Sequence, residues 1–159
     1  MAEKDISYWL MKSEPSVYSI EHLKEEKETI WDGIRNYQAR NYMRKMNIGD
    51  KAFFYHSNCK PPGIIGLMEV IEKDIIDPTQ FDKNSNYFDS KSNEANPRWD
   101  CVKLKYLGEF ERYLSLKELS EMYDPEDLTV VKKGNRLSII PVKNEIAKSL
   151  LKGLGSIKI

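Results

Sequence analysis

The sequence predicts an α+β fold, a small mixed β-barrel of five to six strands with peripheral helices. Short apolar or alternating segments typical of strands recur along the chain, and helical patterns interrupt them singly. Strands and helices do not alternate regularly, as they would in a doubly wound parallel sheet. The 159 residues are 40% hydrophobic and 31% charged, which is ordinary for a globular protein, so we expect residues 1–159 to form a single domain.

The N-terminal segments predict a strand, a short helix and a second extended piece. Residues 7–12 (SYWLMK) are apolar enough for a buried strand, and turn residues follow them. Residues 19–28 begin with a serine suited to cap a helix and place two aliphatic side chains on one helical face. Residues 29–31 are extended and stop at Asp32-Gly33, a pair that favours a tight turn.

A second helix is expected over residues 36–46, because apolar residues recur there at the spacing of one helical face. The inner stripe consists of Ala39, Tyr42, Met43 and Met46. The opposite face carries Tyr37, Arg40, Asn41, Arg44 and Lys45. No acidic residue lies between Gly33 and Met46, so aromatic, amide and basic groups share this exposed face.

The middle of the chain predicts two strands and a long loop. Residues 51–56 are aromatic and strand-like, and a loop over residues 57–63 follows. Residues 64–76 indicate a long bent strand in which Gly66 suits a bulge or a close backbone approach. Residues 77–97 are rich in Asp, Asn, Ser, Pro and Lys; a loop of this length usually has a function.

The C-terminal segments predict two further strands and two helices. Residues 99–110 alternate as a strand does, and a capping box opens a helix over residues 115–122. Residues 136–142 indicate a last strand. Residues 144–153 form an amphipathic helix pattern for which Gly153 is the natural stop.

Several kinds of chemistry have no motif in this sequence. There is no phosphate-binding glycine loop, dinucleotide fingerprint, metalloprotease motif or nucleophile elbow, and neither His22 nor His56 lies in a metal-ligand spacing. Cys59 and Cys101 have no neighbouring cysteine partner, so we expect two reduced, partly buried thiols. We therefore expect no catalytic residue, no cofactor and no metal.

Charge and hydropathy restrict the partners and the compartment. The net charge of zero disfavours binding to nucleic acid by bulk electrostatics, so any such contact needs a local patch. No run of about eighteen apolar residues and no secretory signal is present. We expect an intracellular protein without membrane contact, cytoplasmic in a bacterium or nuclear in a eukaryote.

Residues 29–43 (TIWDGIRNYQARNYM) crowd flat and hydrogen-bonding side chains around one Asp-Gly turn. A base bound in a pocket needs an aromatic wall, amide or hydroxyl groups for its Watson–Crick edge, and cations for the flanking phosphates. This segment supplies all three. Stacking on one ring contributes about 1–3 kcal/mol, so Trp31 alone could dominate such a site. A tryptophan beside a turn is also an ordinary core anchor, and the sequence leaves both roles open.

Six segments together resemble the EVE domain family, in order and over nearly the whole chain. They are YWLMKSEP (8–15), WDGIRNYQARN (31–41), FYHSN (54–58), PPGIIG (61–66), NPRWDCV (96–102) and NRLSIIPV (135–142). The resemblance implies a PUA-like fold related to the YTH modules that bind methylated adenine in RNA. It also implies a non-enzymatic protein whose partner is nucleic acid carrying modified bases, notably modified cytosine in DNA, with RNA as a further ligand.

The resemblance also implies a set of ligand-binding residues. They are Ser13, Trp31, Arg35, Asn36, Tyr37, Arg40, Ser57, Asn58, Arg136 and Ser138. The three arginines are expected at phosphates, and the others at the base. Trp99 fits the core as well as an aromatic cage. Ile140 stands where some relatives carry glutamine, so a contact made by that amide is expected to be missing.

Two other classes of function stay open at the level of sequence. A nucleic-acid-processing enzyme would need Asp32 or His56 beside the pocket. A protein-interaction module would use Tyr37, Tyr42 and the basic helix face to bind an acidic partner. The modification itself is not determined, because one methyl group in an apolar pocket changes affinity by only about 1–3 kcal/mol.

Overall fold

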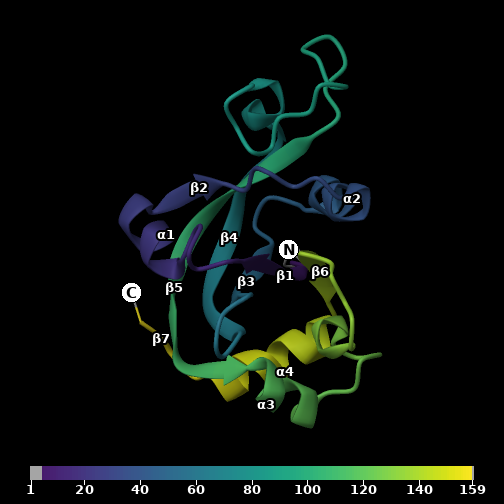
Figure 1. Cartoon of the computed structure of the whole chain (residues 1–159). Coiled ribbons are helices and arrows are strands. Elements are labelled where there is room, and N and C mark those ends of the chain that lie inside the picture. Colours follow the sequence, from purple (N-terminus) through teal and green to yellow (C-terminus); the bar gives the residue numbers. More distant parts are fainter. Residues whose placement is uncertain (1–4, 159) are drawn as a thin grey trace.

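A computed structural model describes residues 5–158 of the chain (Figure 1). Its strands are β1 (Tyr8–Ser13), β2 (Glu28–Ile30), β3 (Lys51–His56), β4 (Gly63–Ile76), β5 (Asp100–Ser115), β6 (Ile139–Val142) and β7 (Ile157–Lys158). Its helices are α1 (Ile20–Glu26), α2 (Tyr37–Lys45), α3 (Leu116–Met122) and α4 (Asn144–Leu154), with short 3-10 turns η1 (Pro78–Phe81) and η2 (Thr129–Val131). The predicted α+β class with peripheral helices is confirmed.

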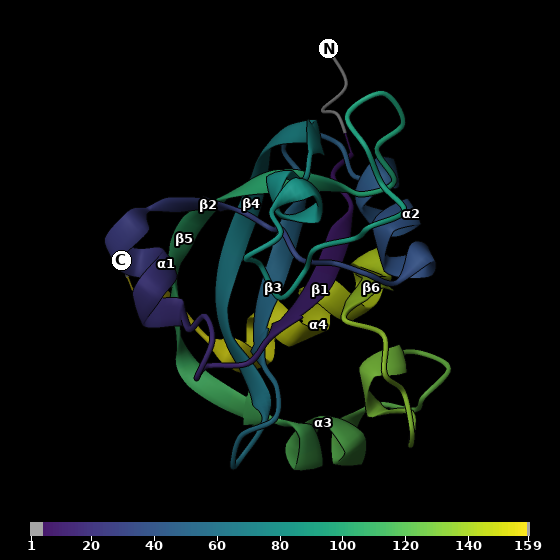
Figure 2. The same cartoon turned by 45° about the horizontal axis from the view of Figure 1, so that its top comes forward.

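All seven strands belong to one sheet, in the order β2-β5-β4-β3-β1-β6, with β7 paired to β5. The pair β1 and β3 is parallel, and the other pairs are antiparallel. The sheet curves strongly (Figure 1), but among the described residues β2 and β6 do not pair, so the barrel stays open. In Figure 2, α1 and α2 lie on either side of the central strands, and α4 passes behind them.

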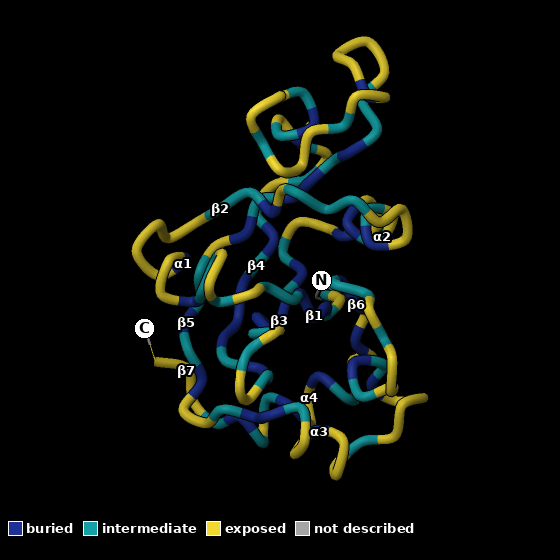
Figure 3. Tube along the Cα trace, viewed as in Figure 1, coloured by how far each residue is buried: buried dark blue, intermediate teal, exposed yellow. Residues whose placement is uncertain are grey.

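Alternation along the strands sends side chains into two separate cores, because successive residues point to opposite faces. The first core consists of Trp9, Met11, Ile20, Leu23, Trp31, Ala39, Met43, Met46, Ala52, Phe54, Met68, Val70, Cys101, Val102, Leu104 and Ile139. The second core consists of Leu10, Phe53, Tyr55, Ile64, Leu67, Phe110, Leu114, Leu119, Leu128, Val130, Ile140, Val142, Ala147, Leu150 and Leu154. Burial follows the strands, and exposed residues gather in the connections (Figure 3).

Two of the three side-chain helix caps, at Ser19 and Ser115, were predicted from the sequence. Side-chain oxygens of Ser19, Asn36 and Ser115 accept from backbone N–H groups in the first turns of α1, α2 and α3. Ala39 and Met43 on the predicted stripe of α2 are buried. These local signals are confirmed because each depends only on neighbours three or four positions away.

Several boundaries differ from the prediction. The first helix, expected over residues 19–28, ends at Glu26. Strand β5 continues to Ser115, because its pairing with β4 extends that far. Strand β6 begins only at Ile139, and α4 passes Gly153 and ends at Leu154. Gly155, with φ of 81°, is the residue that leaves the helix, since glycine adopts that conformation without a steric cost.

Gly66 has the close backbone approach that its place in a strand predicted. The register between β4 and β5 shifts beside it, and an added Cβ there would lie 2.9 Å from the Gly108 carbonyl oxygen and 2.6 Å from Ile20 Cδ1.

Cys59 and Cys101 are both free, and burial raises the pKa of the Cys101 thiol to about 12. None of the helices in residues 5–158 has the length and apolarity that crossing a membrane requires.

Candidate nucleic-acid interface

A cleft of about 860 Å³ lies beside the first core, where the ends of β1 and β3 meet the turn after β2. Its polar lining consists of Lys12, Ser13, Glu14, Glu26, Thr29, Asp32, Ser57, Asn58, Arg136 and Ser138. Its aromatic and aliphatic lining consists of Val17, Tyr18, Ile30, Trp31, Gly33, Ile34 and Tyr87. Volume and mixed lining are those of a site for a small ligand or a single nucleotide.

The sheet itself brings distant hydroxyl and amide groups to the cleft. Strands β1 and β3 run parallel, so they end together, and the Ser57 N–H donates to the Ser13 carbonyl oxygen at 3.0 Å. The Lys12 N–H donates to the Ser138 carbonyl oxygen at 2.8 Å, which adds the segment before β6. Asn58 Nδ2 donates to Glu14 Oε1 at 3.3 Å. Three segments far apart in sequence thus place hydrogen-bonding side chains along one cleft wall.

Trp31 combines the two roles that the sequence left open. Its side chain is only 7% exposed, and its ring meets Phe54 edge-on at 5.7 Å in the first core. It nevertheless lines the cleft. A larger exposed aromatic surface comes from Tyr87, at 38% exposure. Tyr18 and Tyr87 had not been predicted as site residues; the only signal for Tyr87 was its place in the long polar loop.

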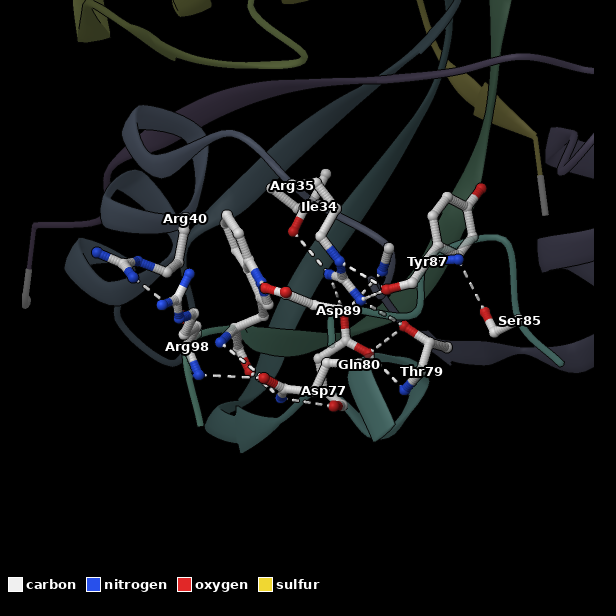
Figure 4. A network of polar contacts seen from close by, with 12 residues as sticks. Ile34, Arg35, Arg40, Asp77, Thr79, Gln80, Ser85, Tyr87, Asp89 and Arg98 are labelled. Carbon is white, nitrogen blue, oxygen red and sulfur yellow. Dashed lines mark hydrogen bonds and ion pairs between the residues drawn. The ribbon is translucent and has the colours of Figure 1, made fainter. Parts of the chain in front are cut away.

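A buried carboxylate fixes the turn after Trp31. Asp77 is fully buried, and its Oδ2 accepts from the Gly33 N–H at 2.8 Å and from Arg35 Nη1 at 3.1 Å (Figure 4). Its Oδ1 accepts from the Thr79 N–H at 2.8 Å. Gly33 adopts φ of 79°, and an added Cβ would lie 2.8 Å from the Tyr87 ring. The turn, the loop and the cleft wall are therefore tied to one another.

Gln80 organises the rest of the loop over residues 77–97. Its buried amide oxygen accepts from Ser92 Oγ at 2.5 Å and from the N–H groups of Arg98 and Trp99 at 3.1 Å each. Its Nε2 donates to the carbonyl oxygens of Asp77 and Trp99. All polar positions of this amide are used, so the segment is a bonded scaffold although it has little regular structure.

Arg35 and Asn36 hold the protein together at positions where ligand contacts were expected. Arg35 Nε donates to the Tyr87 carbonyl oxygen at 2.8 Å, and Nη2 donates to Thr79 Oγ1 at 3.0 Å (Figure 4). Its guanidinium lies 5.9 Å from the Tyr87 ring and 5.2 Å from the Trp99 ring. Asn36 Oδ1 accepts from the Ala39 N–H at 2.9 Å as the cap of α2.

Tyr37 and Arg40 form a second cluster with Trp99. The Tyr37 and Trp99 rings stack at 4.8 Å and 21°, and Trp99 Nε1 donates to Asp89 Oδ2 at 2.8 Å. Arg40 Nη1 donates to the Arg98 carbonyl oxygen at 2.8 Å.

Of the ten predicted binding residues, the cleft lining includes Ser13, Trp31, Ser57, Asn58, Arg136 and Ser138. It does not include Arg35, Asn36, Tyr37 and Arg40.

Two further expectations concern single side chains. Ile140 belongs to the second core, on the face of β6 opposite to Ile139, so an isoleucine there removes no group from the cleft lining. This corrects the expected loss of a contact. His56 is not in the lining; its Nε2 accepts from the Ile20 N–H at 3.2 Å, and burial lowers its pKa. Asp32, the other residue considered for catalysis, does line the cleft.

Two charged groups in the cleft, Asp32 and Lys12, are shifted toward their neutral forms. Burial raises the pKa of the Asp32 carboxyl, and the negative charge of Asp77 raises it further. Burial also lowers the pKa of the Lys12 ammonium. The Tyr18 hydroxyl is buried and has no hydrogen-bond partner among residues 5–158. Within the same residues, no three His, Cys, Asp or Glu side chains are grouped to hold a metal ion.

Comparison with known proteins agrees with this architecture. Human thymocyte nuclear protein 1 is 43% identical over 157 residues, which cover 87% of this chain and 70% of that protein. A crystal structure of human THYN1 in complex with DNA containing 5-methylcytosine is 40% identical, with a TM-score of 0.87 over 96% of this chain and 99% of that one. A Pseudomonas syringae protein of known structure is 41% identical, with a TM-score of 0.87 over 91% of this chain and 97% of that one.

More distant similarity shows the fold alone. The YTH domain of Zygosaccharomyces rouxii MRB1, solved with N6-methyladenosine RNA, is 16% identical with a TM-score of 0.54, over 99% of this chain and 92% of that one. The expected kinship of folds is therefore confirmed. The family model that describes the EVE domain matches residues 7–153, nearly the whole chain. The protein therefore belongs to the EVE domain family, as the sequence motifs predicted.

Proposed function

We propose that this protein is a non-enzymatic reader of modified bases in nucleic acid, which takes one base into the cleft. One observation carries the proposal: a cleft of nucleotide size joins aromatic rings to hydroxyl and amide groups from three converging segments. The relative solved with 5-methylcytosine DNA supports modified cytosine in DNA as the first ligand to test. RNA is the second, because each base can unstack from a single strand.

The lining residues divide into three roles. Trp31 and Tyr87 contact the faces of the base, and stacking is worth about 1–3 kcal/mol per base. Ser13, Ser57, Asn58 and Ser138 offer donors and acceptors to its edge. Asp32 accepts from an exocyclic amino group, the contact by which carboxylates recognise cytosine.

The positive charge at the cleft contacts the phosphates of the strand and not the base. Arg136 is exposed at the cleft edge and contacts a phosphate. Taking a base out of a duplex costs a few kcal/mol, whereas a base in a single strand is freed at a lower cost. We therefore expect higher affinity for single-stranded than for duplex probes, and an affinity that falls as salt rises.

The test is a titration of labelled single-stranded DNA of one sequence carrying cytosine or 5-methylcytosine at one position. Wild type should prefer the modified probe. Tyr87→Ala should weaken binding about five- to a hundredfold, the equivalent of 1–3 kcal/mol. Phe88→Ala is the matched control, because Phe88 is the next residue of the same loop, is 37% exposed and does not line the cleft.

Trp31→Phe supplies a second variant that keeps an aromatic ring in the first core. It should retain the fold, as seen by thermal melting, and lose part of the affinity. Equal binding of both probes by wild type would overturn the proposal, and so would unchanged binding in Tyr87→Ala and Trp31→Phe. Release of free base or cleavage of the probe, followed by mass spectrometry, would show an enzyme instead.

A further inference from the structure

A row of flat groups leads away from the cleft wall. It runs from Tyr87 through the Arg35 guanidinium to Trp99 and ends at Tyr37, with successive separations of 5.9, 5.2 and 4.8 Å. Each member faces the next, and the row starts at a residue that lines the cleft. Tyr37 therefore lies a short distance from the cleft but outside it.

The outer face of Tyr37 is open to solvent. The inner face stacks on Trp99, and the side chain is 50% exposed. The Arg40 guanidinium lies 4.7 Å from the Tyr37 ring and 5.8 Å from the Trp99 ring. A group on the outer face of Tyr37 would be much farther from Trp99, so Arg40 sits beside the stack and leaves that face uncovered.

The exposed ring is held in place before any ligand arrives. Tyr37 is the first residue of α2, and Asn36 caps that helix. Behind it, Trp99 is 4% exposed and is fixed by hydrogen bonds from its backbone N–H to Gln80 and from its Nε1 to Asp89. Binding to a ring that is already ordered costs little conformational entropy.

The charge around Tyr37 favours a phosphate strand. Arg40 donates to the Arg98 carbonyl oxygen and to Asn41 Oδ1, and in residues 5–158 no carboxylate forms an ion pair with it. Lys45 lies on the same helix, whereas Arg44 is paired with Asp100 at 2.6 Å. An unpaired arginine beside an exposed aromatic face is the combination that binds single-stranded nucleic acid.

We propose that the outer face of Tyr37 stacks a second base of the bound strand, a few nucleotides from the base in the cleft, while Arg40 contacts the adjoining phosphate. This inference rests on the proposed function. A strand advances at least about 3.4 Å per nucleotide, so the row of contacts corresponds to a few nucleotides between the two bases. Stacking accepts any base, so this second contact adds affinity without selecting sequence.

The experiment places the fluorescent base 2-aminopurine at each position on either side of one 5-methylcytosine in a single-stranded DNA of about ten nucleotides. Wild type should quench the fluorescence at one or two positions on one side. Tyr37→Phe should keep the quenching, and Tyr37→Leu should lose it together with about five- to a hundredfold in affinity. Met122→Ala on α3 is the control, because Met122 is a large apolar side chain of similar exposure, 49%.

Arg40 is tested through the salt dependence of the same complex. Arg40→Ala should reduce the slope of log affinity against log salt by about 0.7, the value for one phosphate contact on a single strand. Arg112→Ala, at an exposed position on β5, should leave the slope unchanged. An equal slope in wild type and Arg40→Ala would overturn the role of Arg40.

The mononucleotide 5-methyl-dCMP separates this inference from the proposed function, because it fills the cleft only. Tyr37→Leu should bind it as wild type does. If wild type binds the mononucleotide but shows no position-specific quenching, or if Tyr37→Leu binds the long probe as wild type does, the Tyr37 contact is overturned and the cleft remains. If Tyr87→Ala leaves mononucleotide binding unchanged, the proposed function fails as well. Capture of an acidic protein at Tyr37 with no quenching at any position would also overturn the inference.

Discussion

The two cores on opposite faces of the sheet differ in residue composition. The second core is mainly Leu, Val, Ile, Ala and Phe, and α4 contributes three of its residues. The first core contains Trp9, Trp31 and four methionines, and the cleft opens beside it. One face is closed and mostly aliphatic, with the rings of Phe53, Tyr55 and Phe110 among its side chains, whereas the other combines tryptophan and methionine side chains with an accessible hollow.

Buried polar groups follow the same division. Asp50 accepts from Trp9 Nε1, and Asp77, Gln80 and Ser92 form the scaffold that supports the cleft wall. On the closed side, Ser115 caps α3. The hydrogen bonds of such a network offset the free-energy cost of burying its polar groups only when every partner is in place. These networks therefore fix geometry more than they add stability. The second core therefore mainly stabilises the fold, and the first core with its polar network positions the groups that line the cleft.

Truncation in the closed core should give the largest effect on stability. Leu150 on α4 is fully buried, and Leu150→Ala should lower the free energy of unfolding by about 2–5 kcal/mol through lost contacts and a cavity. The affinity for the modified probe should stay the same, measured well below the melting temperature. Denaturant unfolding and probe titration of the same sample check both parts, and a matching loss of affinity would break the division between the two faces.

Two glycines with similar backbone angles should differ in their effect on base binding, with a smaller change in stability than Leu150→Ala. Gly33 and Gly134 have φ of 79° and 81°, but an added Cβ meets the Tyr87 ring only at Gly33, and nothing within 4 Å at Gly134. Alanine at either position should cost about 1–3 kcal/mol of stability through backbone strain. Only Gly33→Ala should also weaken base binding, because Tyr87 must move. Equal affinities in the two variants would show that Tyr87 does not contact the bound base.

The smallest expected effect is a pH dependence at the junction of the faces. Burial lowers the pKa of His56, and its Nε2 accepts from the Ile20 N–H at the start of α1. In the unfolded chain the imidazole titrates at about pH 6.5, so as pH falls through that value the unfolded state takes up a proton that the folded state resists. With respect to His56, the free energy of unfolding should therefore be at its maximum above that pH and should decline below it.

His56→Gln tests this assignment, because an amide oxygen can still accept from the Ile20 N–H but does not titrate near neutral pH. Unfolding curves between pH 8 and pH 5.5 should show a smaller decline for this variant than for wild type. Parallel curves would assign the acid sensitivity to other groups.

The sequence alone determined those features that depend on neighbours along the chain. The caps at Ser19 and Ser115, the buried stripe of α2 and the EVE motifs all lie within short segments, and each is confirmed. Ser13, Ser57, Asn58, Arg136 and Ser138 were named from those motifs, and they lie together at the cleft.

Only the tertiary structure decided which chemical groups meet. Asp77 reaches Gly33 and Arg35 across more than forty positions, and Gln80 reaches Trp99 across 19. Local patterns carry no record of such pairings, which is why Arg35 was expected at a phosphate and Tyr87 was not expected at the cleft. The fold also separated Tyr37 from Trp31, six positions earlier, because the turn fixed by Asp77 sends α2 away from the cleft. Local hydrogen bonds and hydrophobic periodicity can be predicted from the sequence. Which residues line the cleft and which support it depends on the packing of segments that are far apart in the sequence.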